Sequence, residues 1–382
     1  MPTYDSFCRA PLVDPAYVAL PDSAVHTEGT QEKLIRRVLE MVDLSALSPL
    51  DAVLATKLGG YTDMPPMPGL AAAAQALPAD PRAFMDMVRA GMMIAAASKN
   101  KDAMLGVLEA MRAFTDAMPA IGETALLPVG ADALRVAAEL YRRTGQRFLL
   151  TLMERLRAQL PDVSGLFHSF PFQKPFVPET VAEGATDEAA QYHRRMKLLG
   201  TGAVVCDALS ITAQLAMFSG SARDANASKA GVAALQRFHG MPNGAFAADP
   251  YLAGRDLSRA SDLQSVCALT EALLDLLCAS GDAAYAERIE RIVENALAGL
   301  VRPDGVCNAQ AVNRLASDGT CLVKRAEPAQ VSALLRALYA VRRAVWMAKG
   351  EADLALLMPY EGCCLARMDG TPYSGPGGYT NQ

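Results

Sequence analysis

Apolar residues along most of this chain recur at every third or fourth position, the spacing of helices that bury one face. The pattern is clearest in 147–160, 264–278 and 283–300. In the last of these, the apolar stripe consists of Tyr285, Ile289, Ile292, Val293, Ala296, Leu297 and Leu300. Alternating apolar and polar positions, which indicate strands, are almost absent before residue 350. The sequence therefore predicts a mostly helical protein, with about a dozen helices joined by short turns.

Three of the predicted helices end at a hydroxyl residue followed by glycine, and each is followed by another helix. These corners are Thr144-Gly145, Ser219-Gly220 and Ser280-Gly281. Glycine suits them because it readily adopts the left-handed conformation that ends a helix. Successive corners are roughly 61 to 75 residues apart, whereas helical solenoids repeat at a constant period of about 34 to 45 residues. We therefore predict an all-α toroid of helical hairpins rather than a solenoid.

The pattern changes after residue 350, where a short apolar run is followed by a Gly/Pro-rich end. We predict a barrel domain over 1–348 and, over 349–382, a short strand or hairpin with a loose tail. Two long non-helical stretches interrupt the barrel, at 161–185 and 239–262. Because sites are often built on long loops carried by a rigid scaffold, these two are where we look for function.

Composition narrows the possible ligands. The chain has 382 residues, 36 Lys and Arg against 41 Asp and Glu, and a formal net charge of −5. This charge argues against nucleic acid or an anionic membrane, since both select clustered basic residues. The first residues lack the basic start and apolar core of a signal peptide, and no apolar run reaches the roughly 18 residues of a membrane span. We expect a cytoplasmic protein with a small-molecule or carbohydrate ligand. A homo-oligomer is compatible with the sequence.

A group of motifs in the second half of the chain resembles a known family. They are the loop His239-Gly240-Met241-Pro242-Asn243-Gly244 through Gly254, the segment Val266–Glu271, and Ser280-Gly281-Asp282 through Leu297. Together they resemble glycoside hydrolase family 127, the β-L-arabinofuranosidases of the six-hairpin glycosidase superfamily. The segment 345–372 is similar to the family's passage into its β-sandwich, most of which we expect to be missing here. The resemblance implies an (α/α)6 barrel.

The resemblance also implies a retaining mechanism in which zinc holds a cysteine nucleophile and a glutamate protonates the leaving group. Cys267 occupies the family's single metal-cysteine position. Ser265 stands where the family has a ligating glutamate, and Pro250 stands where it has the acid/base glutamate. Ala329 and Gln330 replace the paired cysteines. The sequence therefore predicts a divergent relative that has lost the zinc–cysteine mechanism.

A relocated zinc site is the alternative to that loss. Cys363 and Cys364 form an adjacent pair after Cys267, in the family's order along the chain. The three thiols would then hold zinc. Two adjacent cysteines on opposite faces of a strand are the simpler interpretation, so we expect no cofactor, with zinc as the alternative.

Two carboxylates are the catalytic candidates that remain. Asp249 lies in the Gly/Pro-rich loop expected at the barrel mouth, where its other possible role is to hydrogen-bond that loop. Glu271 lies one turn after Cys267. It is a candidate acid if that helix face points to the barrel centre, and a solvated residue otherwise.

Four further residues are candidates for binding a sugar. His239, Asn243 and Tyr251 belong to the matched loop, and His193 lies where the family brings polar groups towards its cavity. Each has a structural alternative, as a satisfied side chain that holds its own segment together.

Three functions remain open at this point. The first is a divergent carbohydrate-active enzyme, which requires a polar cavity with two carboxyls about 5 to 10 Å apart. The second is a non-catalytic barrel that binds a sugar or a partner protein. The third is an enzyme of different chemistry on a less polar biosynthetic intermediate. The last would use the phenylalanines of 161–185, which form either a stacking platform or a hydrophobic plug.

Overall fold

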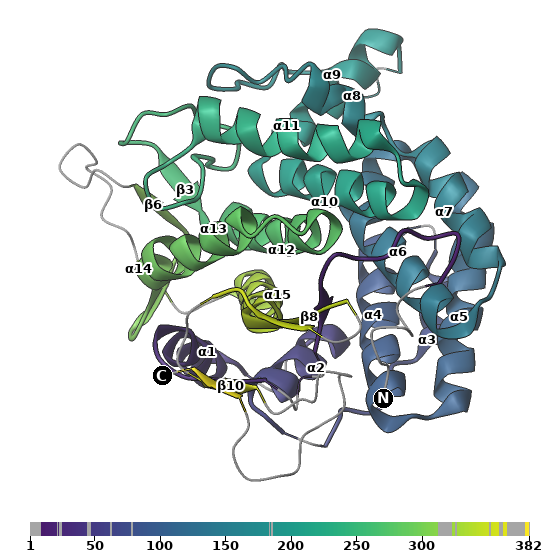
Figure 1. Cartoon of the computed structure of the whole chain (residues 1–382). Helices are drawn as coiled ribbons and strands as arrows, with labels where there is room; N and C mark the ends of the chain where they lie inside the picture. The colour runs from purple at the N-terminus through teal and green to yellow at the C-terminus, as the bar shows by residue number, and fades with distance from the viewer. Residues whose placement is uncertain are drawn as a thin grey trace.

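The computed structural model describes residues 9–381 except 21, 23–24, 44–46, 62, 78, 183, 185, 312–322, 325–326, 351–352, 359–361 and 365–378. Within this part of the chain, six long helices pack side by side into a closed inner ring (Figure 1). Each contacts the next in the order α2, α4, α6, α10, α12, α15 and back to α2. Their bounds are α2 Pro49–Leu58, α4 Pro81–Ser98, α6 Glu123–Thr144, α10 Gly202–Ser219, α12 Leu263–Ser280 and α15 Pro328–Val345.

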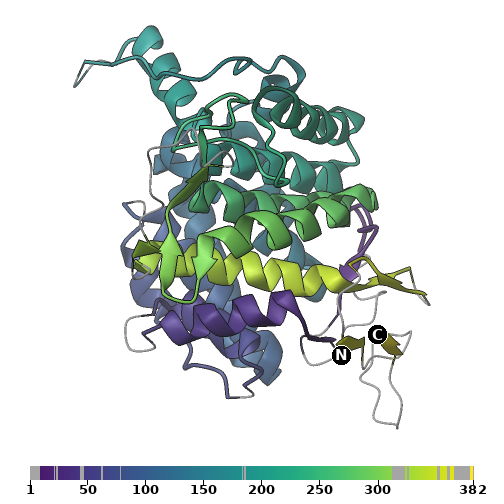
Figure 2. The same ribbon diagram turned by 90° about the vertical axis from the view of Figure 1, so that its left-hand side faces the viewer.

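A second layer of helices covers the outside of this ring. α5 packs on α4, α7 on α6, α11 on α10 and α13 on α12, while α1 lies along α15 (Figure 2). The bounds are α1 Thr30–Met41, α5 Lys101–Ala117, α7 Phe148–Gln159, α11 Ala222–His239 and α13 Ala284–Ile292. Shorter helices are α3 Leu70–Gln75, α8 Val163–His168, α9 Glu188–Leu199 and α14 Ala298–Leu300, with a 3-10 turn at Met118–Ala120 and a π turn at Val293–Leu297. The predicted all-α toroid of hairpins is confirmed.

The hairpin corners form for the reason expected from the sequence. Gly145, Gly220 and Gly281 adopt φ of 71°, 66° and 71°, and each donates its backbone N–H to the last turn of the helix that it ends. Side-chain caps begin the helices, among them Asp80 on α4 and Asp262 on α12. Left-handed glycines and polar caps together satisfy backbone groups that a helix end leaves unpaired.

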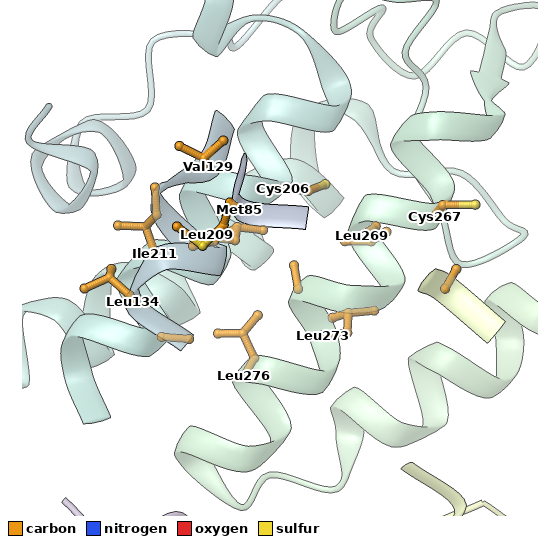
Figure 3. Close-up of a cluster of buried hydrophobic side chains, with 14 of the residues drawn as sticks. Met85, Val129, Leu134, Cys206, Leu209, Ile211, Cys267, Leu269, Leu273 and Leu276 are labelled. Atoms are coloured by element: carbon orange, nitrogen blue, oxygen red, sulfur yellow. The ribbon is translucent and has the colours of Figure 1, made fainter. Parts of the chain in front are cut away.

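The core lies between the two layers and between neighbouring inner helices. Figure 3 shows one part of it, with Met85, Leu134, Ile211, Leu273 and Leu276 packed together from α4, α6, α10 and α12. By length and composition alone, α10 and α12 are apolar enough to cross a membrane. However, 72% and 61% of these two segments are buried inside the protein, as expected for core helices.

Short strands join the two ends of the chain. β8 (Trp346–Lys349) pairs with β1 (Val18–Ala19) and β9 (Asp353–Leu356), and β10 (Gly362–Cys364) pairs with β2 (Val25–Thr27) and β11 (Tyr379–Asn381). Elsewhere β3 (Ala260–Asp262) pairs with β6 (Ala309–Ala311), and β5 (Gly305–Cys307) with β4 (Val301–Arg302) and β7 (Val323–Lys324). The predicted domain boundary at 348/349 falls inside β8, and the division into two domains stays a prediction.

Candidate functional site in the barrel lumen

Charged side chains from five inner helices meet in the centre of the ring. We call this set the lumen cluster; it consists of Arg82, Asp86, Arg89, Asp132, Arg135, Asp207, Glu271, Asp275 and Arg336. The members on one helix are three or four residues apart, so they share the face that points inward. Each of these five inner helices is thus apolar towards its neighbours and charged towards the lumen.

Asp132 is the hub of the cluster. Its carboxylate accepts hydrogen bonds from Arg89 at 2.8 Å, from Arg336 at 2.5 Å and from Arg135. Burial alone would raise the pKa of Asp132, but Arg89, Arg135 and Arg82 outweigh it and hold the pKa at about 2. Asp132 is therefore a permanent anion that fixes the positions of the arginines around it.

Glu271 and Asp275 lie one turn apart on α12, and both reach the lumen. Glu271 lies 3.7 Å from Arg89 and 3.4 Å from Arg336, measured between nitrogen and carboxylate oxygen. Its side chain is still 21% exposed. Burial raises the pKa of Glu271 above its ordinary value, against the opposing charge of Arg89. This carboxyl therefore holds a proton more tightly than an ordinary glutamate and keeps contact with solvent.

Asp275 is held much more firmly than Glu271. Arg135 donates to both of its carboxylate oxygens, at 3.2 Å from Nε and 2.5 Å from Nη2. The amide of Gln214 donates to Oδ1 at 3.0 Å. Such a two-point contact from an arginine fixes the plane of a carboxylate.

Two more acids of the cluster sit in poorly solvated positions. Burial raises the pKa of Asp207 to about 8 and that of Asp86 to about 6, although Arg82 opposes both shifts. In the described part of the chain, no hydrogen bond or ion pair engages the Asp207 carboxyl. With Asp207 protonated near neutral pH, the four arginines of the lumen cluster face four acids rather than five.

A cavity of about 1400 Å³ opens onto the lumen cluster from one end of the ring. It is lined by the C-terminal halves of the inner helices, including Arg89, Arg135, Glu271, Asp275 and Arg336. The N-terminal segment forms its outer wall; Val13 N–H donates to Met217 O and Ala16 N–H to Cys278 O, at the ends of α10 and α12. We call this cavity the C-terminal pocket. Glu271 and Asp275 are thus two acids facing one pocket, a geometry suited to acid–base chemistry.

Asp249 lies at the opposite end of the ring from this pocket. It is exposed on the loop before α12, close enough to Asp262 to raise the pKa of that carboxyl, which burial raises further. Asp262 caps α12 nine residues before Glu271, which places it about 14 Å along the helix axis from that residue. The structure therefore brings Glu271 to the lumen and leaves Asp249 outside it.

The four candidate sugar-binding residues hold their own segments together. His239 is buried; its Nε2 lies 2.6 Å from Phe172 O, and its Nδ1 accepts the Gly254 N–H at 2.9 Å. The Asn243 side chain accepts the Ala245 N–H within its turn, and Tyr251 stacks edge-on against Phe176. His193 on α9 lies 3.5 Å from Glu179. None of the four lines the C-terminal pocket.

The phenylalanines of 161–185 form a plug rather than a platform. Phe167, Phe170 and Phe172 are buried and pack ring against ring, with Phe238 of α11 beside them. Their faces are covered by one another, so they offer no open surface to a ligand.

The three cysteines proposed for zinc lie in two separate parts of the chain's fold, α12 and β10. Cys267 is 2% exposed in the core, and burial raises the pKa of its thiol well above the ordinary value, which opposes the thiolate that zinc requires. Cys363 and Cys364 lie in β10, at the opposite side of the molecule from the start of α12 (Figure 2). Across the described residues, no three His, Cys, Asp or Glu side chains converge as metal ligands.

Sequence reasoning found Glu271 but missed Asp275, Asp207 and the arginines around them. A signal was present, because Asp207 is the one charged residue, and Gln214 the one amide residue, of the largely buried helix α10. Such polar residues in a core helix need partners, and the toroid prediction supplies a lumen for them.

Comparisons with known proteins support the fold and assign no family. No protein-family model matches the chain, and no curated protein matches its sequence. A solved structure described as a glycoside hydrolase superposes with a TM-score of 0.61 at 10% identity, covering 92% of this chain and 64% of that one. A GH127 β-arabinofuranosidase gives 0.42 at 12% identity over 92% and 65%, and a family 88 glycosyl hydrolase from Bacteroides vulgatus gives 0.39 at 11% over 83% and 99%.

The chain spans less than two thirds of the length of the first two of these structures. At such identities the likeness concerns the fold alone. The expected toroid architecture is therefore confirmed, since the first of these structures shares it over 92% of this chain.

Proposed function

We propose that this protein is a carbohydrate-active enzyme that hydrolyses a glycosidic bond in the C-terminal pocket, with Glu271 as the proton donor. The observation that carries the proposal is the pairing of Glu271 with Asp275 on one face of α12. The first has its pKa raised, and the second is fixed by Arg135 and Gln214. Two neighbouring carboxyls in different environments, one poorly solvated and one held by an arginine, are a usual arrangement for acid and base roles.

The spacing of the pair suits this chemistry. Side chains one helical turn apart have Cβ atoms about 5–6 Å apart, so both carboxyls can face one sugar unit, as the two carboxyls of glycosidases do. Glu271 transfers its proton to the glycosidic oxygen as the bond to the anomeric carbon breaks. A water molecule attacks that carbon and gives a proton to Asp275. In each turnover Glu271 therefore loses one proton and Asp275 gains one.

The fixed charges around the pair serve the same reaction. Arg135 and Gln214 orient the Asp275 carboxylate, which favours the positive charge that develops on the sugar ring. Arg89 and Arg336 lie beside Glu271 and stabilise its carboxylate after the proton has left. The carbohydrate class of the substrate is supported by the fold shared with a glycoside hydrolase.

The experiment is a screen of aryl glycosides, including neutral and acidic sugars, followed by variants of the pair. Glu271→Gln and Asp275→Asn should each lower turnover of any substrate found by at least about a hundredfold. Glu287→Gln, an exposed glutamate on α13, is the matched control and should keep full turnover. Unchanged turnover in Glu271→Gln would overturn the proposal.

A second candidate is a barrel that binds a carbohydrate without cleaving it. The observation that favours it is the saturation of Asp132 and Asp275 by arginines, which holds both carboxylates in place whether or not a substrate is bound. Binding of a saccharide in the pocket, with no turnover on any member of the screen, would select this candidate.

A further inference from the structure

Basic residues of this acidic protein are concentrated around the C-terminal pocket. Among the described residues that line it, twelve are Lys or Arg and six are Asp or Glu. One third of the 36 basic residues of the chain thus lines a single cavity, although the whole protein carries a net charge of −5. A cleft lined by an excess of one charge attracts ligands of the opposite charge.

Most of these cations are neutralised by a neighbouring carboxylate, as Arg143 is by Glu139 and Arg342 by Glu32. Three exposed cations of the lining are not: within the described part of the chain, Arg9, Lys99 and Lys101 form no ion pair with an acid. All three are exposed. We call them the basic rim.

The basic rim lies at one corner of the pocket. Lys99 and Lys101 follow the C-terminal end of α4. The Arg9 guanidinium lies against Gly145 at the C-terminal end of the adjacent helix α6, and it donates to Tyr141 O at 3.4 Å. The chain therefore gathers three uncompensated cations where a ligand would enter.

Lys99 occupies a backbone position that disfavours lysine. It is the C-cap of α4, with φ of 52°, and it is the non-glycine residue with positive φ in the described structure. At the equivalent ends of α6, α10 and α12 the chain has Gly145, Gly220 and Gly281. A side chain in this conformation costs free energy that glycine would not. The lysine is thus kept at a cost to stability, as is common where a residue serves a ligand.

We propose that the basic rim binds an acidic group, a carboxylate or a sulfate ester, on an oligosaccharide held in the C-terminal pocket. This inference rests on the proposed function for the kind of ligand. It adds that the ligand is anionic and that its charge is recognised away from the bond to be cleaved.

The distance between the basic rim and Glu271 sets the minimum size of the ligand. Lys99 lies ten residues after Arg89, which contacts Glu271, so the rim is about 15 Å along the helix axis from the acid. This exceeds the length of one sugar ring. The acidic group therefore sits on a neighbouring unit of a chain rather than on a monosaccharide.

The test is calorimetric binding, in a Glu271→Gln background that leaves the probes intact. The probes are a galacturonate hexasaccharide, a sulfated galactose hexasaccharide and an uncharged galactose hexasaccharide. At least one charged probe should bind roughly tenfold more tightly than the uncharged one. Whichever charged probe binds identifies the acidic group.

Two double variants locate the binding charge. Lys99→Gly with Lys101→Gln should weaken binding of the charged probe by about fivefold, and its melting temperature should rise because glycine relieves the backbone. Lys174→Gln with Lys229→Gln removes two exposed lysines elsewhere and should leave binding unchanged. Equal binding of charged and uncharged probes, no binding of either charged probe, or equal behaviour of the two double variants would overturn the inference.

The outcome is separable from that of the proposed function. Loss of affinity in the rim variant, together with unchanged turnover in Glu271→Gln, would refute the catalytic role of Glu271 and keep the acidic ligand. Loss of turnover in Glu271→Gln with no preference for charged probes would do the reverse.

Discussion

The two ends of the barrel differ in how their residues are used. At the N-terminal ends of α10 and α12, the loop 239–262 packs tightly against the ring. The Gly202 N–H donates to Pro250 O, and Ala248 and Leu252 are fully buried. At the C-terminal ends, the inner helices instead line a cavity of about 1400 Å³ that reaches Glu271 and Asp275.

The difference shows that the segment carrying a sequence resemblance need not be the segment that carries the acids with altered pKa values. The motif that resembles family 127 lies in the tightly packed loop, where His239 and Asn243 satisfy backbone groups and Asp249 is exposed. The acids with altered protonation lie in the lumen instead. In this chain the loop that carries the motif is a packed segment, while the site that we propose is at the other end.

The largest expected effect compares one acid from each end. Glu271→Gln should lower turnover by at least about a hundredfold because it removes the proton donor. Asp249→Asn should change turnover by less than about twofold, since that carboxyl is exposed outside the lumen. Steady-state kinetics on a substrate from the glycoside screen measures both, and a greater loss in Asp249→Asn would reverse our assignment of the two ends.

Removal of the hub of the lumen cluster should give the next largest effect. Asp132→Ala leaves Arg89, Arg135 and Arg336 close together without their shared anion. Breaking a buried ionic network in this way costs about 3–5 kcal/mol of unfolding free energy. Urea denaturation measures it, with exposed Asp304→Ala as the control. A cost no larger than that of the control would show that the cluster is not a network.

The packing of the loop 239–262 against the ring can be tested by a substitution at Gly202. A Cβ on Gly202 would collide with Ser265 Oγ and lie 2.6 Å from Ala248 Cβ, so Gly202→Ala should cost about 1–3 kcal/mol. Gly106→Ala is the control, because open space surrounds Gly106 within α5, and alanine there should stabilise by about 0.5–1 kcal/mol. If Gly202→Ala were as stable as its control, the loop would not be packed on the ring as described.

A smaller, pH-dependent effect should come from Asp207. Its pKa in the folded protein, about 8, is above the ordinary value of 3.8, so the folded state binds this proton more tightly than the unfolded state. The stability that this carboxyl contributes is complete below about pH 4 and is lost as the pH rises towards 8. Asp207→Asn should therefore gain about 1 kcal/mol or more over the wild type above pH 8, and nothing below pH 4.

Urea denaturation at a series of pH values measures this gain. Asp116→Asn, an exposed carboxyl on α5, is the control and should show no such pH dependence. A constant difference between Asp207→Asn and the wild type at all pH values would mean that Asp207 is ionised throughout.

Much of the fold could be predicted because its signals are local. The three glycine corners identified hairpins directly, but the corner after α4 was invisible because Lys99 stands where glycine was expected. The lumen was harder to predict, since Arg336 and Asp132 are 204 residues apart in sequence yet only 2.5 Å apart in space. Helical periodicity identifies the buried face of a helix, but only the closed ring decides which polar face points inward, as it does for Glu271.

The central claim, that the carbohydrate site is the C-terminal pocket, is tested most directly by NMR of methyl-labelled methionine. Met92, Met93 and Met217 line the pocket, whereas Met241 is buried in the loop at the other end. The three hexasaccharides would be titrated into Glu271→Gln protein. We predict shifts in the signals of the pocket methionines and none in that of Met241. Shifts confined to Met241, or no shift with any of the three, would contradict the account.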